Sequence, residues 1–288
     1  MGPFSEVIIG ATQVDGTVAF LELFDFVVVE EVGIDDHFAR DVLGLDGVPE
    51  GAVRMGSRSR PDSATLLIVA TPHAGRAAVD WEPGPRALDV YTVDLDATLA
   101  IATAAGFAVS PVGRLAAGPM TMRQSLVSGP GALSVVFVET THRRSSVLDL
   151  EHHGDHSEPH SVVWVVADHP AEVTWWTTGG WTSAGQWNEG FTAGNTISFT
   201  EPSIGDELGL PQRSTPITMT MLSDPTVEPI RLELMTFDDH LESASPAGVD
   251  SARSLLRSGL FAMVVEGAGG DACRLITSPG GVRMVLRP

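Results

Sequence analysis

Histidines gather at one place in the chain, in the run EHHGDHSEPH over residues 151–160. Imidazoles and carboxylates at this density can bind a metal ion, so the run admits interpretation as a metal-binding tract. The run is also polar, mixed in charge and without hydrophobic periodicity, which is more typical of a solvated linker. We therefore expect only His160, which adjoins the apolar stretch that follows, to lie in a strand.

Other common catalytic arrangements are missing from the sequence. Cys273 is the one cysteine, which excludes a disulfide framework and a multi-thiolate metal site. The chain contains no G-x-S-x-G nucleophile motif, no G-x-G-x-x-G and no G-x-x-x-x-G-K-[ST] phosphate loop. Serine hydrolysis and nucleotide binding therefore have no support in the sequence.

Tryptophans are concentrated in a second region, where five of them fall within 24 residues. Aromatic side chains at this density often line an apolar ligand pocket, and the alternative is core packing. Trp175 and Trp176 are expected on a helix that packs against a sheet, whereas Trp164 is expected to share a strand face with His160. The pocket candidates are Trp164, Trp181 and Trp187. They favour a bulky substrate that is at least partly aromatic.

Two arginines alternate on the predicted final strand, Arg283 and Arg287, opposite Met284 and Leu286. One of them could pair with a carboxylate or enolate of a substrate, and we take Arg283 as the candidate. The alternative is that both are surface arginines.

Charge limits the possible partners. Lys and Arg total 17 and Asp and Glu total 37, which gives a net charge of −20. A field of this sign repels nucleic acids and anionic membrane surfaces. No apolar run reaches the length of a transmembrane helix, and the N-terminus lacks the pattern of a secretory signal. We expect a cytoplasmic protein, monomer or homodimer, whose partner is a small molecule.

The candidate side chains must be positioned by regular elements, and the chain repeats one order of elements four times. The copy at residues 84–141 is the clearest. Its segment ALDVYTV alternates as a half-buried strand, with Asp89 and Tyr91 on one face. Asp94 follows at an N-cap position, a helix runs to Gly106, and SGPG joins two later strands.

Each copy predicts a βαβββ module, and four such modules predict an α+β fold. We expect the modules to pair in chain order into two domains, with a polar linker at residues 144–158. The first domain would span residues 1–143, with modules at 1–72 and 84–141, and the second 159–288, with modules at 159–237 and 238–288.

A tandem βαβββ unit, with an Asp-initiated helix, a small-residue stop and a PGG hairpin before the last strand, resembles the vicinal oxygen chelate superfamily in its two-domain form. That group includes glyoxalase I, the bleomycin-resistance proteins and the extradiol dioxygenases. The resemblance covers nearly the whole chain and lies in the order of modules, not in a catalytic motif. It implies that paired modules curl their mixed sheets into cups that hold a divalent metal or an organic ligand. Isomerases, lyases, oxygenases and sequestering proteins share this fold, so the fold does not determine the function.

The resemblance also implies that metal ligands would lie on the first and last strands of a module. In module three, His160 opens the first strand, and Glu233 lies on the last with Met235 on the same face. In module four, His240 opens the first strand and Glu242 shares its face. His160, Glu233 and His240 would form a set of two histidines and one carboxylate, which suits Fe(II), Mn(II), Zn(II) or Ni(II). The last strand of module four has no carboxylate, which departs from the pattern of the extradiol dioxygenases.

The first domain offers no metal ligands at the matching places. Asp89, Tyr91 and Glu139 are nevertheless expected to face its cup. There they suit a scaffold or an organic-ligand pocket.

Two functions follow from this interpretation. In the first, an enzyme, the metal polarises two oxygens of a small hydrophobic or aromatic substrate, and Glu242 moves a proton in an isomerisation, epimerisation or elimination. Ring oxygenation is the variant with iron. In the second, the protein needs no metal and either sequesters a small hydrophobic molecule or performs acid–base chemistry with Asp89, Tyr91, Glu139 or Glu242.

Overall fold

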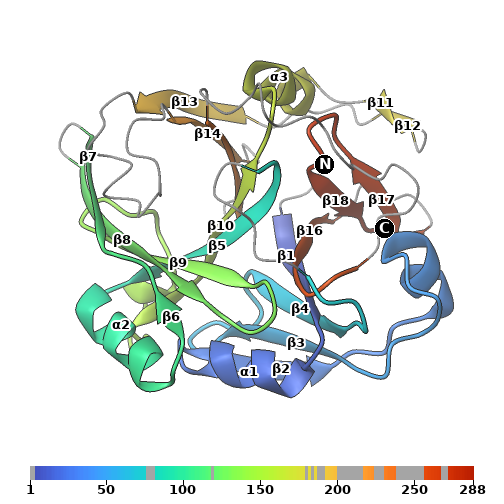
Figure 1. Ribbon diagram of the computed structural model, residues 1–288, viewed down its shortest axis with the longest axis horizontal. Coiled ribbons are helices and arrows are strands. Elements are labelled where there is room, and N and C mark those ends of the chain that lie inside the picture. Colours follow the sequence, from blue (N-terminus) through green and yellow to red (C-terminus); the bar gives the residue numbers. More distant parts are fainter. Residues whose placement is uncertain are drawn as a thin grey trace.

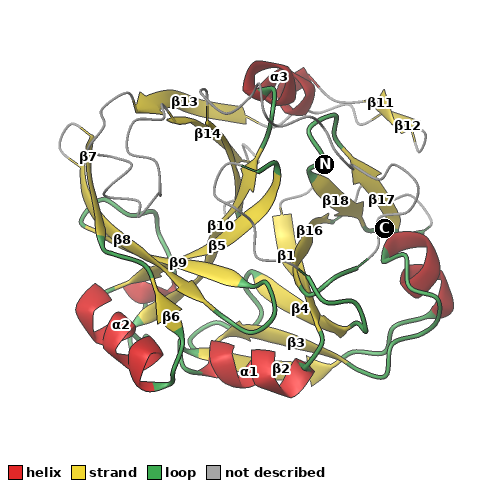
Figure 2. Ribbon diagram, viewed as in Figure 1, coloured by secondary structure: helices red, strands yellow, loops and turns green. Residues whose placement is uncertain are grey.

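The structure is a computed structural model that describes residues 4–75, 82–117, 120–178, 181–182, 185–186, 192–199, 217–223, 230–237, 256–266 and 272–288. Two mixed sheets lie side by side in this part of the chain, and the helices lie at their periphery (Figures 1 and 2). A separate ribbon pairs β11 (Trp181–Thr182) with β12 (Gly185–Gln186). The α+β fold predicted from the sequence is confirmed.

One sheet contains seven described strands in the order β17–β18–β16–β1–β4–β3–β2. These strands are β1 (Phe4–Ala11), β2 (Phe26–Glu31), β3 (Ala52–Ser57), β4 (Thr65–Ala70), β16 (Gly259–Val265), β17 (Arg274–Thr277) and β18 (Arg283–Leu286). β1 pairs in parallel with β4 and antiparallel with β16. We call this the seven-stranded sheet.

The other sheet contains nine described strands, ordered β13–β14–β15–β10–β5–β9–β8–β6, with β7 also paired to β8. These strands are β5 (Gly84–Thr92), β6 (Ala108–Val109), β7 (Gly113–Ala117), β8 (Met120–Ser128), β9 (Ser134–Thr140), β10 (His156–Val165), β13 (Thr192–Phe199), β14 (Ile217–Ser223) and β15 (Arg231–Phe237). β10 lies at its centre, antiparallel to β5 and parallel to β15. We call this the nine-stranded sheet.

The pairing of the modules differs from the expected order. Module one joins the end of the chain through β1 and β16, and module two joins module three through β5 and β10. The pairing of modules depends on contacts between strand edges that lie far apart in the sequence. Such contacts leave no local sequence pattern, so the order of modules along the chain did not predict them. β16 lies beside β1 and antiparallel to it. The segment 238–255, predicted to open module four, lies outside the described residues.

Local sequence signals account for the helices well. These are α1 (Val14–Glu22), α2 (Leu95–Ala104), α3 (His169–Thr178), the π-helix η1 (Phe38–Val42) and the 3-10 helix η2 (Val147–Asp149). The Asp94 carboxylate accepts a 2.9 Å hydrogen bond from the Ala97 N–H, so the predicted N-cap of α2 is confirmed. Gly106 follows the helix at φ 87°, a left-handed conformation that glycine adopts without strain.

The largest hydrophobic cluster of the described residues contains side chains of both sheets. Phe24, at the end of α1, lies 4.4 Å from Phe137 of β9 between ring centroids, and Phe20 lies 4.7 Å from Phe107. Trp164 and Trp176 are fully buried in the same cluster. Burial of one such side chain contributes about 1.5–3 kcal/mol, so these contacts bind the halves strongly.

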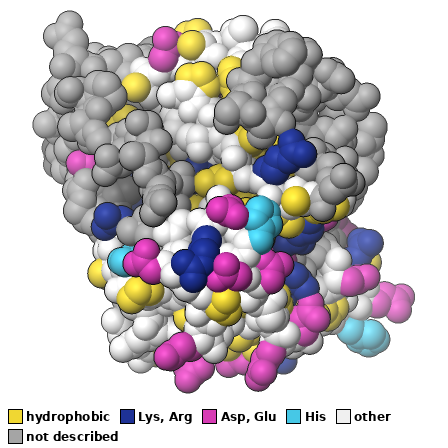
Figure 3. Space-filling model, turned by 90° about the vertical axis from the view of Figure 1, so that its right-hand side faces the viewer, with side chains coloured by type: hydrophobic (Ala, Val, Ile, Leu, Met, Phe, Trp, Pro, Cys, Tyr) yellow, Lys and Arg dark blue, Asp and Glu magenta, His cyan; other side chains and the backbone are white. Residues whose placement is uncertain are grey.

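The surface reflects the acidic composition. Figure 3 shows acidic side chains spread over the described part of one face, with arginines among them. In the part of the chain that the structure describes, no helix has the length and apolar character needed to cross a membrane.

Candidate active site

Strand register brings a group of polar side chains to one face of the nine-stranded sheet. Ser161 of β10 pairs with Asp89 of β5 on one side and with Arg231 of β15 on the other. Glu233 lies one row further along, opposite Val163. The alternate residues of these strands belong to the hydrophobic core on the opposite face; they include Leu88, Val162, Leu232 and Leu234. We call Asp89, Tyr91, His160, Ser161, Arg231 and Glu233 the polar cluster.

A β-bulge brings His160 into this cluster. Pro159 pairs with Val90 and Ser161 with Asp89, so β10 has one residue more than β5 at this point. The extra residue, His160, joins the face of Ser161 instead of the opposite one. Trp164 was expected to share the face of His160, and this was wrong: it is buried in the core on the other side. Strict alternation failed because it does not allow for a bulge.

His160 is held by Tyr91 and Arg231. Its imidazole stacks on the Tyr91 ring with centroids 3.8 Å apart and planes 8° from parallel. Arg231 Nη2 lies 3.4 Å from both His160 Nδ1 and the Tyr91 hydroxyl. The Ser161 hydroxyl also lies 3.2 Å from Nδ1. In the tautomer in which Arg231 donates to Nδ1, a neutral ring carries its proton on Nε2. Nε2 is buried and has no hydrogen-bond partner among the described residues.

Electrostatics keep this ring neutral. Burial lowers the pKa of His160 well below its usual value, and the charges of Arg231 and Arg144 lower it further. Arg144 belongs to the segment that connects β9 to β10. This segment lies against the cluster, since Leu148 of η2 packs with Tyr91 and Val138.

The carboxyl group of Asp89 is buried with an unsatisfied oxygen. The Ser161 hydroxyl donates a 2.6 Å hydrogen bond to Asp89 Oδ2, while Oδ1 has no partner among the described residues. Burial raises the pKa of Asp89 to about 7, although the bond from Ser161 and the charge of Arg231 oppose the rise. An unpaired buried acceptor of this kind costs about 1–3 kcal/mol.

Glu233 forms an interacting pair with Asp89. Burial and the repulsion from Asp89 raise the pKa of Glu233 to about 8, against the attraction of Arg231. Two neighbouring carboxyl groups that titrate near neutrality exchange protons as a pair. Near neutral pH, one of these groups can accept a proton while the other can donate one.

The described donors do not fit a metal ion. Among the described residues, no group of three His, Cys, Asp or Glu side chains is placed to hold one. The Arg231 guanidinium also lies against His160 Nδ1 and carries the positive charge of the cluster. His240 and Glu242 lie outside the described residues, so the predicted set of His160, Glu233 and His240 stays a prediction.

The other predicted site residues are dispersed. Met235 is half-buried on the face of Glu233. Arg283 lies on the seven-stranded sheet, 5.1 Å above the ring of Phe261 and away from the polar cluster. Trp181 lies in β11, and Trp187 lies outside the described residues.

The prediction for Glu139 was wrong. Its carboxylate accepts a 2.9 Å hydrogen bond from the Leu95 N–H at the start of α2 and pairs with Arg123. It therefore serves a helix N-terminus, where a negative charge is stabilised, instead of facing the cup.

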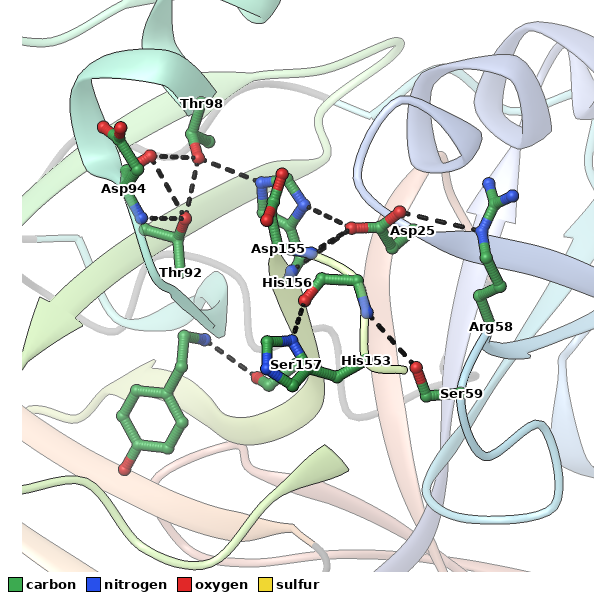
Figure 4. Close-up of polar contacts among 12 residues, drawn as sticks. Asp25, Arg58, Ser59, Thr92, Asp94, Thr98, His153, Asp155, His156 and Ser157 are labelled. Atoms are coloured by element: carbon green, nitrogen blue, oxygen red, sulfur yellow. Dashed lines mark hydrogen bonds and ion pairs between the residues drawn. The ribbon is translucent and has the colours of Figure 1, made fainter. Parts of the chain in front are cut away.

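His156 corrects the prediction of a solvated linker. β10 begins at His156, which is buried and donates from Nδ1 to Asp25 at 3.0 Å, while its Nε2 contacts the Thr98 hydroxyl at 2.9 Å (Figure 4). Residues 156–158, assigned to the linker, thus belong to the central strand. Modules one, two and three meet at this histidine.

The seven-stranded sheet offers a contrast to the polar cluster. Its buried acid, Glu6, is paired with Arg54 and Arg287 at 2.6 Å each and accepts from Thr65 at 3.1 Å. Apolar residues of η1 pack on the same face, with Ile8 and Leu67. Because Glu6 is already paired with two arginines, we place the candidate site on the nine-stranded sheet.

Sequence reasoning did not select two members of the cluster, Ser161 and Arg231. Arg231 left a signal, since it alternates with Leu232 on the same strand as Glu233. No sequence signal marks Ser161, because it shares a face with its neighbour His160 only through the bulge.

Solved structures share this fold. Glyoxalase I from Zea mays is 10% identical, with a TM-score of 0.56 over 99% of this chain and 92% of that one. A proposed dioxygenase from Bacillus subtilis subsp. subtilis str. 168 is 6% identical, with a TM-score of 0.59 over 99% and 84%. No protein-family model and no curated protein matches the sequence. The likeness extends over 99% of the chain, so this protein shares the fold of these two structures.

Proposed function

Starting from the two-domain fold shared with the vicinal oxygen chelate superfamily, we propose that this protein is an enzyme that moves a proton within a small oxygenated molecule, at the polar cluster. The reaction class is isomerisation, epimerisation or elimination. The observation that carries the proposal is the pair of buried carboxyl groups, Asp89 and Glu233, in one cluster with His160 Nε2, which has no hydrogen-bond partner among the described residues. Acid–base pairs of enzymes are tuned toward neutral pH in this way.

The chemistry follows from the three groups. The ionised carboxylate of the pair takes a proton from a C–H next to a substrate carbonyl. The electron pair of that bond moves onto the carbonyl oxygen, where the Nε2–H of His160 and the charge of Arg231 stabilise the enolate. The carboxyl group returns the proton to carbon, or a leaving group departs with the electron pair.

A divalent metal, Fe, Mn, Zn or Ni, is the competing source of polarisation. It would take His160 and Glu233 as ligands, and His240 as the third. Arg231 favours the metal-free form, because its guanidinium already brings a positive charge to His160 Nδ1. Both forms use the same face of the same sheet, so an experiment must separate them.

Hydrogen–deuterium exchange at carbon tests the proposal. Pyruvate, 2-oxobutyrate, phenylpyruvate and methylglyoxal are incubated with the untagged protein in D2O, and loss of the C–H signal is followed by NMR. We expect exchange above the buffer rate for at least one compound, with and without EDTA. Exchange abolished by EDTA and restored by one of the four metals would favour the metal form.

Two variants make the test specific. Asp89→Asn and Glu233→Gln keep the shape of the side chains but remove the proton carriers, and we expect each to lower exchange at least about a hundredfold. Glu139→Gln, a carboxylate on the helix side of the sheet, should exchange as wild type. No exchange by wild type, or full exchange by the double variant D89N/E233Q, would contradict the proposal.

A further inference from the structure

We propose that the ligand of the polar cluster is a small carboxylic acid whose carboxylate is bound by Arg231, with a second oxygen of the same molecule on His160 Nε2. This inference rests on the proposed function in that it names the substrate class of the same site. It concerns binding alone, so it can be tested without any reaction.

Arg231 has no carboxylate at ion-pair distance among the described residues, although its guanidinium is partly buried. Its two polar contacts, with His160 and Tyr91, are both 3.4 Å long and both involve neutral groups. Within the described residues, it forms no ion pair with a carboxylate, and its Nε is buried without a hydrogen-bond partner. A buried arginine with an N–H that has no hydrogen-bond partner is expected to bind an anion.

Two arginines of the seven-stranded sheet do form ion pairs with a buried carboxylate. Arg54 and Arg287 each place a nitrogen 2.6 Å from a Glu6 oxygen. Arg287 directly follows β18 and Arg231 begins β15, and each of these strands ends a module. Arg287 forms an ion pair with Glu6, whereas Arg231 acts on Asp89 and Glu233 through its charge and forms no ion pair with either.

The edge formed by Nε, which has no partner among the described residues, and Nη2, which has only two 3.4 Å contacts there, selects a carboxylate. Nε and Nη2 lie on the same side of a guanidinium and present two parallel N–H groups, which match the two oxygens of a carboxylate. His160 contacts the same Nη2 through Nδ1. Its Nε2, on the other side of the ring, is therefore near the guanidinium as well. Donors in this order suit a carboxylate with a carbonyl or hydroxyl oxygen on the neighbouring carbon.

A second cation favours an anionic ligand. Arg144, on the segment that precedes η2, is close enough for its charge to lower the pKa of His160. The segment is anchored on the sheet, because the Val147 N–H donates a 2.9 Å hydrogen bond to Glu158 of β10. Two guanidinium charges therefore act at the imidazole.

Binding of benzoylformate and of its methyl ester, measured by isothermal titration calorimetry at constant ionic strength, tests the inference. The two probes differ only in the carboxylate, and benzoylformate has no C–H beside its ketone, so proton exchange cannot interfere. We expect the acid to bind about ten- to a hundredfold more tightly than the ester, the ratio typical of a charge-assisted hydrogen-bonded pair. Arg231→Met should remove this preference, and Arg231→Lys should retain part of it.

Controls separate the possible failures. Arg40→Met removes an exposed arginine of an i,i+4 pair with Asp36 and should leave binding unchanged. Circular dichroism establishes that each variant is folded. Equal affinity for acid and ester, unchanged acid binding by folded R231M, or no binding of the acid would overturn the inference. Binding of the acid without exchange of any carbonyl compound would instead leave the inference standing and contradict the proposed proton transfer.

Discussion

The imidazole of His160 lies flat on the phenol ring of Tyr91, with ring centroids 3.8 Å apart. The two residues belong to β10 and β5, the neighbouring strands that join modules two and three. Because the stack and the contact from Arg231 Nη2 hold the ring, its Nε2 has a defined direction. A fixed, neutral donor next to two buried carboxyl groups is the arrangement from which the functional proposal is built.

The raised pKa values of Asp89 and Glu233 predict how stability depends on pH. Their folded pKa values, about 7 and about 8, lie above the ordinary values of 3.8 and 4.5. The folded state therefore binds protons more tightly than the unfolded state, and stability is lost as the pH rises from about 4 to 8. The loss from one such group is on the order of 4 kcal/mol.

Urea denaturation at pH 5 and pH 8 measures this loss. The double variant D89N/E233Q should lose less stability than wild type between the two pH values, whereas E139Q should follow wild type. If wild type and the double variant give parallel profiles, the two carboxyl groups do not titrate near neutrality in the folded protein.

Arg231 and Arg287 should contribute differently to the free energy of unfolding. Arg287→Met removes one of two partners from buried Glu6, and we expect a cost of about 2 kcal/mol in the free energy of unfolding. Arg231→Met removes a guanidinium that has no carboxylate partner among the described residues, and the change should stay within about 1 kcal/mol. Denaturation of both variants at neutral pH compares them, and an equal cost would show that Arg231 is a structural residue.

Asp25 should be important for the junction of the modules. It adopts φ 63° and accepts hydrogen bonds from the Asp155 N–H at 2.8 Å and from His156 Nδ1 at 3.0 Å. Asp25→Ala loses these bonds at a strained position and should cost about 2 kcal/mol or more. Asp25→Asn tolerates the left-handed conformation and keeps an acceptor oxygen, so it should cost less.

Acid provides a second check on Asp25. The hydrogen bond from His156 is the main cause that lowers its pKa below 3.8. The stabilisation is therefore present above this value and is lost as the pH falls through the lowered pKa. The difference between wild type and D25N should shrink in acid, and a difference that does not depend on pH would contradict this account.

The sequence predicted elements whose signals are local. The N-cap Asp94 and the helix stop at Gly106 are set by neighbouring residues, and both are found in the structure. Alternation on β15 also placed Glu233 and Met235 on one face, because that strand runs without a bulge beside β10.

Non-local features could not be predicted in this way. The bulge at His160 exists only in the pairing of β10 with β5, and it separates the faces of His160 and Trp164. The pairing of β1 with β16 depends on strand edges far apart in the chain. Glu139 lies within β9, and only the proximity of α2 explains its role. Each error thus concerns a contact between distant segments.

The proton shared by Asp89 and Glu233 is the most direct test of the account. Infrared spectroscopy of the protein at pH 7 detects a buried protonated carboxyl group by its C=O stretch, with D89N/E233Q as the reference. We predict a protonated carboxyl band in wild type that is absent from the double variant and disappears at higher pH. Two ionised carboxylates at pH 7, as a bound metal ion would require, would contradict the account.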